Sequence, residues 1–159
     1  METFPITKAG FVALENELKD LKSVQRPAVI QDIATAREHG DLSENAEYHA
    51  AREQQSFIEG RIRELEAVIG KAKIIDVTAL TGTTVKFGAT VLIVNEDTDV
   101  EERYTIIGEY ETDMKNRKIS VTAPISRALI GKSIGDSVEV RSPKGLSSYE
   151  ILEVEFKEV

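Results

Sequence analysis

One stretch decides the fold: residues 36–53, which read AREHGDLSENAEYHAARE. Apolar residues recur at helical spacing before it, over residues 11–36, and again after it, over residues 48–69. Between the two patterns stands Gly40, which can adopt the left-handed conformation that ends a helix, so residues 40–43 form a turn. The sequence therefore predicts two long helices joined by a short turn.

Two carboxylates, Asp41 and Glu44, lie at this turn. Their spacing suits a capping box, with Asp41 as the N-cap of the second helix and Glu44 at its third position, and Ser43 is an alternative cap. Each carboxylate also has spare oxygen lone pairs, and Mg²⁺ accepts one or two protein carboxylates while it keeps several waters. Capping and metal binding are compatible, but two acids alone make an incomplete metal site.

Composition restricts the possible classes of protein. The 159 residues are 41% hydrophobic and 30% charged, as in a globular protein of one or two domains. There is no cysteine, which excludes disulfides, thiolate metal sites and thiol nucleophiles, and two histidines make a zinc site unexpected. We find no apolar run long enough to span a membrane and no signal peptide, so we expect a cytoplasmic protein without a membrane partner.

The net charge of −8 is not confined to one tail, and neither half of the chain has an excess of Lys and Arg. Unassisted binding to a phosphate backbone depends on clustered basic residues that displace counterions. If a nucleic acid is involved, another component must hold it.

The first helix is predicted to begin after Thr7, which can cap it, with Ile6 and Phe11 as a hydrophobic staple. Its apolar seam changes phase by one residue near Pro27, so we expect a kink or local unwinding there within one continuous helix. The expected seam residues are Phe11, Leu14, Leu18, Leu21, Val29, Ile33 and Ala36 in the first helix, and Tyr48, Ala51, Gln55, Ile58, Ile62, Leu65 and Ile69 in the second.

Gly70 is expected to stop the second helix. Because the turn is short and the two seams match, the sequence predicts an antiparallel helical hairpin, a coiled coil, as an N-terminal domain over residues 1–78. Alanines replace leucines near the turn, which allows the two helices to approach closely there.

From residue 79 the pattern changes to β-branched strands separated by turns, with one helix at Pro124–Ile130. We therefore expect a small C-terminal antiparallel-sheet domain over residues 79–159 and an α+β fold for the whole chain. This domain has no His, no Cys and no serine with a partner base, so we expect a docking domain without catalysis. The expected strands are Thr84–Phe87, Ala89–Asn95, Arg103–Ile107, Lys118–Thr122, Ser137–Arg141 and Tyr149–Phe156.

The run Ala36–Gln55, with Asp41 and Glu44 in place, resembles the hairpin tip of the bacterial transcript cleavage factors, the GreA/GreB family, and its GreA branch in particular. The resemblance extends over the whole chain, at the Thr7-x-x-Gly10 opening, Arg26-Pro27, Ile75–Val77, Phe87–Val91 and Pro124–Lys132.

The resemblance implies a monomeric transcription elongation factor that binds beside the secondary channel of bacterial RNA polymerase. Its C-terminal domain would resemble the FK506-binding proteins and dock at the channel rim. Its hairpin would reach the active centre of a backtracked complex, where Asp41 and Glu44 help to hold the second Mg²⁺ and a water, so that the polymerase cuts the 3′ end of the nascent RNA. The factor would thus not be an enzyme itself, and the magnesium would be shared with the polymerase.

Five further residues at the tip need an interpretation. Arg37 and Arg52 could touch RNA phosphates, or they could pair with neighbouring glutamates, and the sequence does not decide between these. Tyr48 is interpreted as a seam residue that shields the neck of the tip, and His39 and His49 as surface residues, with proton transfer as the alternative.

Two rival functions remain at this stage. A related protein of the same architecture could occupy the secondary channel and inhibit the polymerase without cleavage. Alternatively, the fold rather than the tip could act, as in a protein-interaction or chaperone-like factor. Replacement of the two acids distinguishes this last possibility from the metal hypothesis, because only the metal hypothesis requires Asp41 and Glu44.

Overall fold

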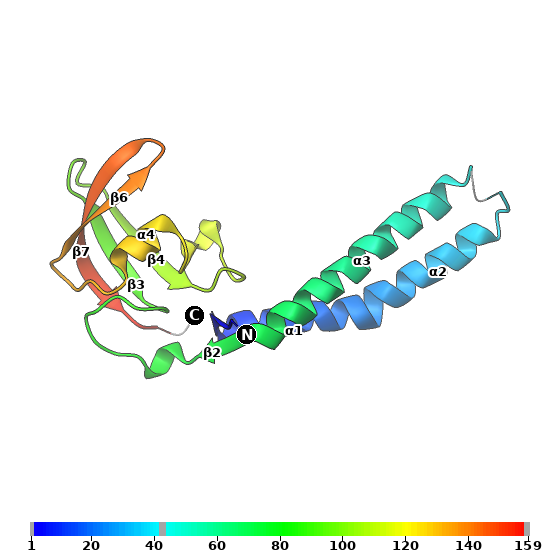
Figure 1. The fold of residues 1–159 in the computed structure, drawn as a ribbon, viewed down its shortest axis with the longest axis horizontal. Helices are drawn as coiled ribbons and strands as arrows, with labels where there is room; N and C mark the ends of the chain where they lie inside the picture. The colour runs from blue at the N-terminus through cyan, green and yellow to red at the C-terminus, as the bar shows by residue number, and fades with distance from the viewer. Residues whose placement is uncertain (1, 42–43, 158–159) are drawn as a thin grey trace. The chain divides into compact units, whose positions relative to one another are not determined.

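The computed structural model describes residues 2–41 and 44–157, so the alternative cap Ser43 lies outside the described residues. The chain divides into two compact units, one of Val12–Lys71 and one that combines Met1–Phe11 with Ala72–Val159 (Figure 1). Helices form the first unit and a curled sheet dominates the second, so the predicted α+β class is confirmed. None of the helices in the described part of the chain has the length and apolar composition that a membrane crossing needs.

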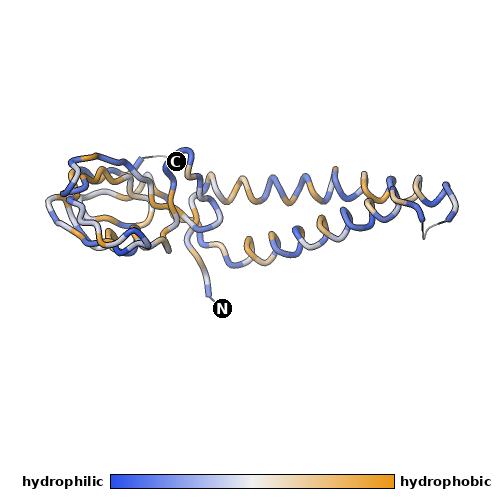
Figure 2. Tube along the Cα trace, turned by 90° about the horizontal axis from the view of Figure 1, so that it is seen from above, coloured by the Kyte–Doolittle hydropathy of each residue, from blue (hydrophilic) through white to orange (hydrophobic). Residues whose placement is uncertain are grey.

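The helical unit is the predicted antiparallel pair. Its elements are α1 (Lys8–Asp20), the π-helical turn η1 (Leu21–Gln25), α2 (Arg26–Arg37) and α3 (Ala46–Lys71). Apolar and polar residues alternate along both arms (Figure 2). The buried seam residues are Leu14, Leu21, Val29, Ile33 and Ala36 on one arm and Ala51, Ile58, Ile62, Leu65 and Val68 on the other.

The expected phase change near Pro27 is accommodated by the π-helical turn η1. The amide N–H of Arg26 donates to the carbonyl of Leu21, five residues back, so the turn holds one residue more than an α-helical turn. This extra residue explains why Val29 follows Leu21 by eight positions and still faces the seam. Pro27, which has no N–H to donate, lies in the first turn of α2, where that loss is tolerated. Local unwinding is confirmed.

The predicted stop at Gly70 is wrong. Helix α3 runs through Lys71 and passes directly into β2 (Ala72–Ile75). The helix ends where β2 pairs in parallel with β1 (Phe4–Thr7), a strand pair that the apolar pattern did not reveal. Hydrogen bonding to a distant segment, rather than a glycine, therefore ends this helix.

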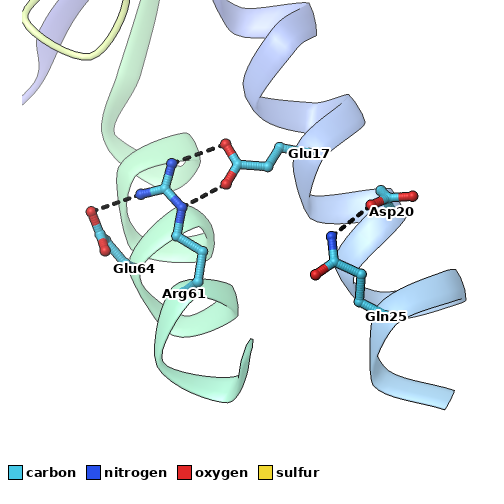
Figure 3. A network of polar contacts seen from close by, with 5 residues as sticks. All are labelled: Glu17, Asp20, Gln25, Arg61 and Glu64. Carbon is cyan, nitrogen blue, oxygen red and sulfur yellow. Dashed lines mark hydrogen bonds and ion pairs between the residues drawn. The ribbon is translucent and has the colours of Figure 1, made fainter. Parts of the chain in front are cut away.

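Ion pairs connect the two arms of the hairpin. The guanidinium of Arg61 on α3 holds both carboxylate oxygens of Glu17 on α1, at 2.6 and 2.9 Å, and also Glu64 at 2.9 Å (Figure 3). Arg26 and Glu59 form a second two-point contact, with both N···O distances at 2.8 Å. Two-point contacts of planar groups have a strong geometric preference, so they fix how the two arms align.

The second unit contains a five-stranded sheet in the order β5-β4-β3-β7-β6 and one short helix, α4 (Pro124–Leu129). The strands are β3 (Thr90–Asn95), β4 (Glu101–Ile107), β5 (Lys118–Ser120), β6 (Ser137–Ser142) and β7 (Gly145–Glu155). They enclose a core of Val85, Ala89, Val91, Ile93, Ile106, Ile119, Leu129, Val138, Ile151 and Val154.

Two details differ from the predicted sheet. Strand β5 pairs with β4 in parallel rather than antiparallel, because the connection from Gly108 to Arg117 returns the chain to the same end of the sheet. Residues 84–87 are not a strand: Thr84 makes only an isolated bridge with Ser133. Val85 is nevertheless fully buried, so this apolar residue packs in the core without being part of a β-strand.

Residues 1–11 group with the sheet rather than with the helices, which differs from the expected boundary after residue 78. The carboxylate of Glu111 accepts hydrogen bonds from the backbone N–H of Thr7 and of Gly108, each at 2.9 Å, and from the hydroxyl of Thr7. The same hydroxyl accepts the N–H of Gly10 at 3.1 Å, which confirms Thr7 as the cap of α1. Separate folding of residues 1–78 and 79–159 stays a prediction, as does the likeness to FK506-binding proteins.

Candidate functional site at the hairpin tip

The turn after α2 is built on successive short-range hydrogen bonds. The N–H groups of Glu38, His39 and Gly40 each donate to the carbonyl three residues earlier, which tightens the end of the helix. Gly40 has a φ of 96°, a conformation that costs glycine little and other residues more. Gly40 thus directs the chain away from α2 toward Asp41, as the sequence predicted.

Asn45, rather than Asp41, caps α3. Helix α3 begins at Ala46, and the side-chain oxygen of Asn45 accepts the N–H of Tyr48 at 3.1 Å. The capping interpretation of Asp41 and Glu44 is therefore wrong, because both residues precede the cap. The reason is that the turn contains more residues than a capping box at Asp41 allows.

The same Asn45 side chain also closes the hairpin. Its amide nitrogen donates to the carbonyl of Ala36, near the end of α2, at 2.6 Å. Asn45 is 8% exposed, so one buried amide satisfies a backbone group of each helix. Sequence reasoning missed this residue. The available signal was an asparagine, a strongly preferred N-cap, directly before the first residue of a helical pattern.

Asp41 and Glu44 both lie exposed between the two helices. Their carboxylate oxygens are the hard donors that Mg²⁺ prefers. Across residues 2–41 and 44–157, no group of three or more His, Cys, Asp or Glu residues could hold a metal ion. The two acids therefore fit magnesium by ligand type, as part of a site that needs ligands from elsewhere.

Arg37 and Arg52 converge on Tyr48. Their guanidinium carbons lie 5.9 and 6.0 Å from the centre of the Tyr48 ring, and Arg52 donates to the phenol oxygen at 3.2 Å. The two cations, Arg37 first and then Arg52, lower the pKa of the Tyr48 phenol because they hydrogen-bond to it. Within the described residues, no ion pair joins either guanidinium to a glutamate, so the predicted alternative of pairing with glutamates is not realised in this structure.

The two arginines border one hollow on the helical unit, of about 380 Å³. Its other lining residues are Ile30, Ile33, Ala34 and Gln55. A second hollow, of about 580 Å³, is lined by residues that include Asp32, His39 and Glu47. Both His39 and His49 are exposed, as the sequence predicted.

Comparison with known proteins covers nearly the whole chain. Residues 4–74 match the family model described as transcription elongation factor, N-terminal, and residues 80–156 match the model described as transcription elongation factor, GreA/GreB, C-term. The chain is 59% identical to transcription elongation factor GreA of Rickettsia prowazekii over 156 residues, which are 98% of this chain and 96% of that protein.

Two further similarities illustrate the range of relatives. The GreA of Ruegeria pomeroyi is 60% identical over 98% of this chain and 99% of its own length. The crystal structure of GreA factor homolog 1 of Thermus thermophilus covers 98% of this chain and 99% of its own, at 22% identity and a TM-score of 0.44. On the two family models and the near full-length identity to curated relatives, the chain belongs to the GreA/GreB family of bacterial transcription elongation factors.

Proposed function

We propose that this factor binds bacterial RNA polymerase at the secondary channel and stimulates cleavage of the nascent RNA 3′ end in backtracked, arrested complexes. The chain is not the catalyst in this proposal. It completes an active centre that belongs to the polymerase, and the sheet unit supplies the docking surface.

The observation that carries the proposal is the exposure of Asp41 and Glu44 in the turn between two long helices. Neither acid caps α3, because Asn45 does so, and the turn therefore presents carboxylates that the helix does not need. Two carboxylates cannot hold Mg²⁺ tightly alone, but they can complete a site that polymerase carboxylates and an RNA phosphate already furnish.

Asp41 and Glu44 would hold the second magnesium ion of the polymerase. A magnesium ion bound at such a site would supply Lewis-acid catalysis of phosphodiester hydrolysis. Arg37 and Arg52, which converge on the ring of Tyr48, would contact the RNA phosphates beside the scissile bond.

The test uses halted elongation complexes and measures RNA length over time. We expect the wild-type chain to accelerate cleavage, and Asp41→Asn or Glu44→Gln to abolish this acceleration while polymerase binding and helix content persist. Amides keep the side-chain size but remove the charge that a hard cation requires. If the wild-type chain suppresses cleavage, it is a channel inhibitor. If the variants stimulate like wild type, the acids have no role in metal binding.

A second expectation concerns the protein alone. The purified chain with Mg²⁺ should not cut free RNA, because its tip offers two clear carboxylate ligands and its net charge is −8. Incubation with labelled RNA, followed by gel analysis, checks this. Cleavage that persists in the Asp41→Asn variant would reveal a contaminating nuclease, whereas cleavage that disappears with it would contradict the shared-site mechanism.

A further inference from the structure

Tyr48 has more contacts at the tip than shielding of the hairpin neck requires. Its ring lies within about 6 Å of two guanidinium groups that come from different helices, Arg37 at the end of α2 and Arg52 in α3. Its phenol oxygen accepts a hydrogen bond from Arg52. The side chain thus connects two cations that are fifteen positions apart in the sequence.

Two cations beside one ring repel each other, so something must hold them. The negative face of an aromatic ring attracts guanidinium groups, and the phenol oxygen adds an acceptor. Tyr48 supplies both, and the same cations lower the pKa of its phenol, as expected when they favour the charged form of the oxygen.

The backbone of Tyr48 is itself fixed. Its N–H donates to the side-chain oxygen of Asn45, and the amide nitrogen of Asn45 donates to the carbonyl of Ala36. The backbone that carries the Tyr48 ring is therefore held by contacts to both helices. Arg37 and Arg52 border the same 380 Å³ hollow, which has Ile30 and Ile33 on its wall. One anion in front of this hollow could therefore meet both guanidinium groups.

We propose that Tyr48 is a positioning residue that presents Arg37 and Arg52 as one guanidinium pair to a single phosphodiester of the RNA. Guanidinium groups bind phosphate oxygens through paired N–H donors, so their common orientation decides whether one phosphate is bound twice or once. This inference rests on the proposed function, since it assigns the phosphate to the RNA that is cleaved.

The test compares Tyr48→Phe with wild type in halted elongation complexes, at saturating factor and across a factor titration. The ring remains in Tyr48→Phe, so the hairpin keeps its packing, but the acceptor is lost. We expect the maximal cleavage rate to fall about three- to tenfold, the effect of one lost hydrogen bond, while the half-saturating concentration is unchanged. A merely structural Tyr48 predicts wild-type rates for Tyr48→Phe, and that result overturns the proposal.

A double-variant cycle tests whether Tyr48 acts through the arginines. If it does, Tyr48→Phe should cause no further loss in an Arg37→Ala/Arg52→Ala background, whereas an additive loss overturns the proposal. Tyr104→Phe is the matched control, because Tyr104 also bonds an arginine, Arg117, but in the sheet unit. Its cleavage rate should equal that of wild type.

A measurement on the free protein separates this proposal from the proposed function. The full chain is titrated at low salt with a single-stranded ribotrinucleotide up to millimolar concentrations, where weak binding is measurable without a component that holds the RNA, and the arginine side-chain NMR signals are followed. In wild type the Arg37 and Arg52 signals should shift together, and Tyr48→Phe should weaken the apparent affinity at least about threefold. Equal affinity in both proteins, or no shift in wild type, overturns the positioning role even if cleavage is stimulated. Conversely, a positive titration without stimulated cleavage refutes only the proposed function.

Discussion

At the scale of single residues, one buried amide organises the tip. Asn45 accepts the N–H of Tyr48 in the first turn of α3 and donates to the carbonyl of Ala36 in α2, which also accepts the N–H of His39, so one side chain connects the two helix ends. Because the cap function lies with Asn45, the acids at Asp41 and Glu44 are left exposed. The capping role at the tip thus belongs to Asn45 and to neither acid.

Replacement of Asn45 should therefore destabilise the hairpin. We expect Asn45→Ala to lower the free energy of unfolding by about 1–3 kcal/mol, because it removes a cap and one of the two hydrogen bonds that the Ala36 carbonyl accepts. Urea denaturation followed by circular dichroism measures this. Asn45→Ser keeps a capping oxygen but cannot reach Ala36, so it should restore part of the loss. If Asn45→Ser loses as much as Asn45→Ala, the bond to Ala36 carries the whole effect.

At the scale of the helical elements, ion pairs fix the position of α1 and α2 along α3, which apolar packing alone does not specify. Arg26 begins α2 directly after the π-helical turn, and its two-point contact with Glu59 joins α2 to α3 at that level. Arg61 and Glu17 do the same for α1. The hairpin thus has an ion pair across its arms on each side of the phase change in its seam.

The Arg26–Glu59 pair predicts a dependence of hairpin stability on pH. The hydrogen bonds from Arg26, with the nearby positive charges, hold the pKa of Glu59 below its ordinary value of 4.5. A carboxyl whose pKa is lower in the folded state stabilises the fold above 4.5, and this contribution is lost as the pH falls through the folded-state pKa. Wild type should therefore lose more stability than Glu59→Gln between neutral pH and about pH 3.

Urea denaturation at a series of pH values measures this difference. Arg26→Gln is the matched control, because it removes the same pair from the other side and should flatten the same acidic part of the curve. Parallel curves for wild type and Glu59→Gln would show that the pair does not contribute to stability.

At the scale of the whole molecule, the N-terminal residues belong to the sheet unit. The carboxylate of Glu111 receives two donors from Thr7, more than a hundred positions away, and one from Gly108. A Cβ on Gly108 would lie 2.5 Å from the backbone carbonyl of Pro5, so this position requires glycine, and a Cβ on Gly10 would displace the carboxylate of Glu111. In contrast, the main apolar cluster of this unit lies within residues 85–154, although Ile6 and Val77 of the same unit are also buried.

The location of the core leads to a prediction for truncated chains. Residues 79–159 should fold alone, because they contain the main apolar cluster, and they should compete with the full chain for polymerase without stimulating cleavage. Glu111→Gln should lower the stability of the sheet in the full chain by about 1–3 kcal/mol, since an amide cannot accept all three donors. In the fragment, where Thr7 is absent, the same substitution should have a smaller effect.

Hydrogen exchange of the β3 amides reports the stability of the sheet in both proteins. Equal effects of Glu111→Gln in the full chain and in the fragment would show that the bonds to Thr7 do not stabilise the sheet. A fragment that does not fold would contradict the predicted domain division.

Local patterns in the sequence were sufficient for the hairpin, its turn at Gly40, the phase change near Pro27 and the exposed acids at the tip. Helical periodicity and turn chemistry depend on neighbours within a few residues, so they can be recognised without the fold. Tertiary structure decided what needs distant partners: Asn45 as the cap that also binds Ala36, the end of α3 at the β1–β2 pair, the parallel pairing of β5, and the contact of Glu111 with Thr7. Each depends on groups brought together only by folding, and a polar side chain gives no local sign of which distant backbone group it will bind.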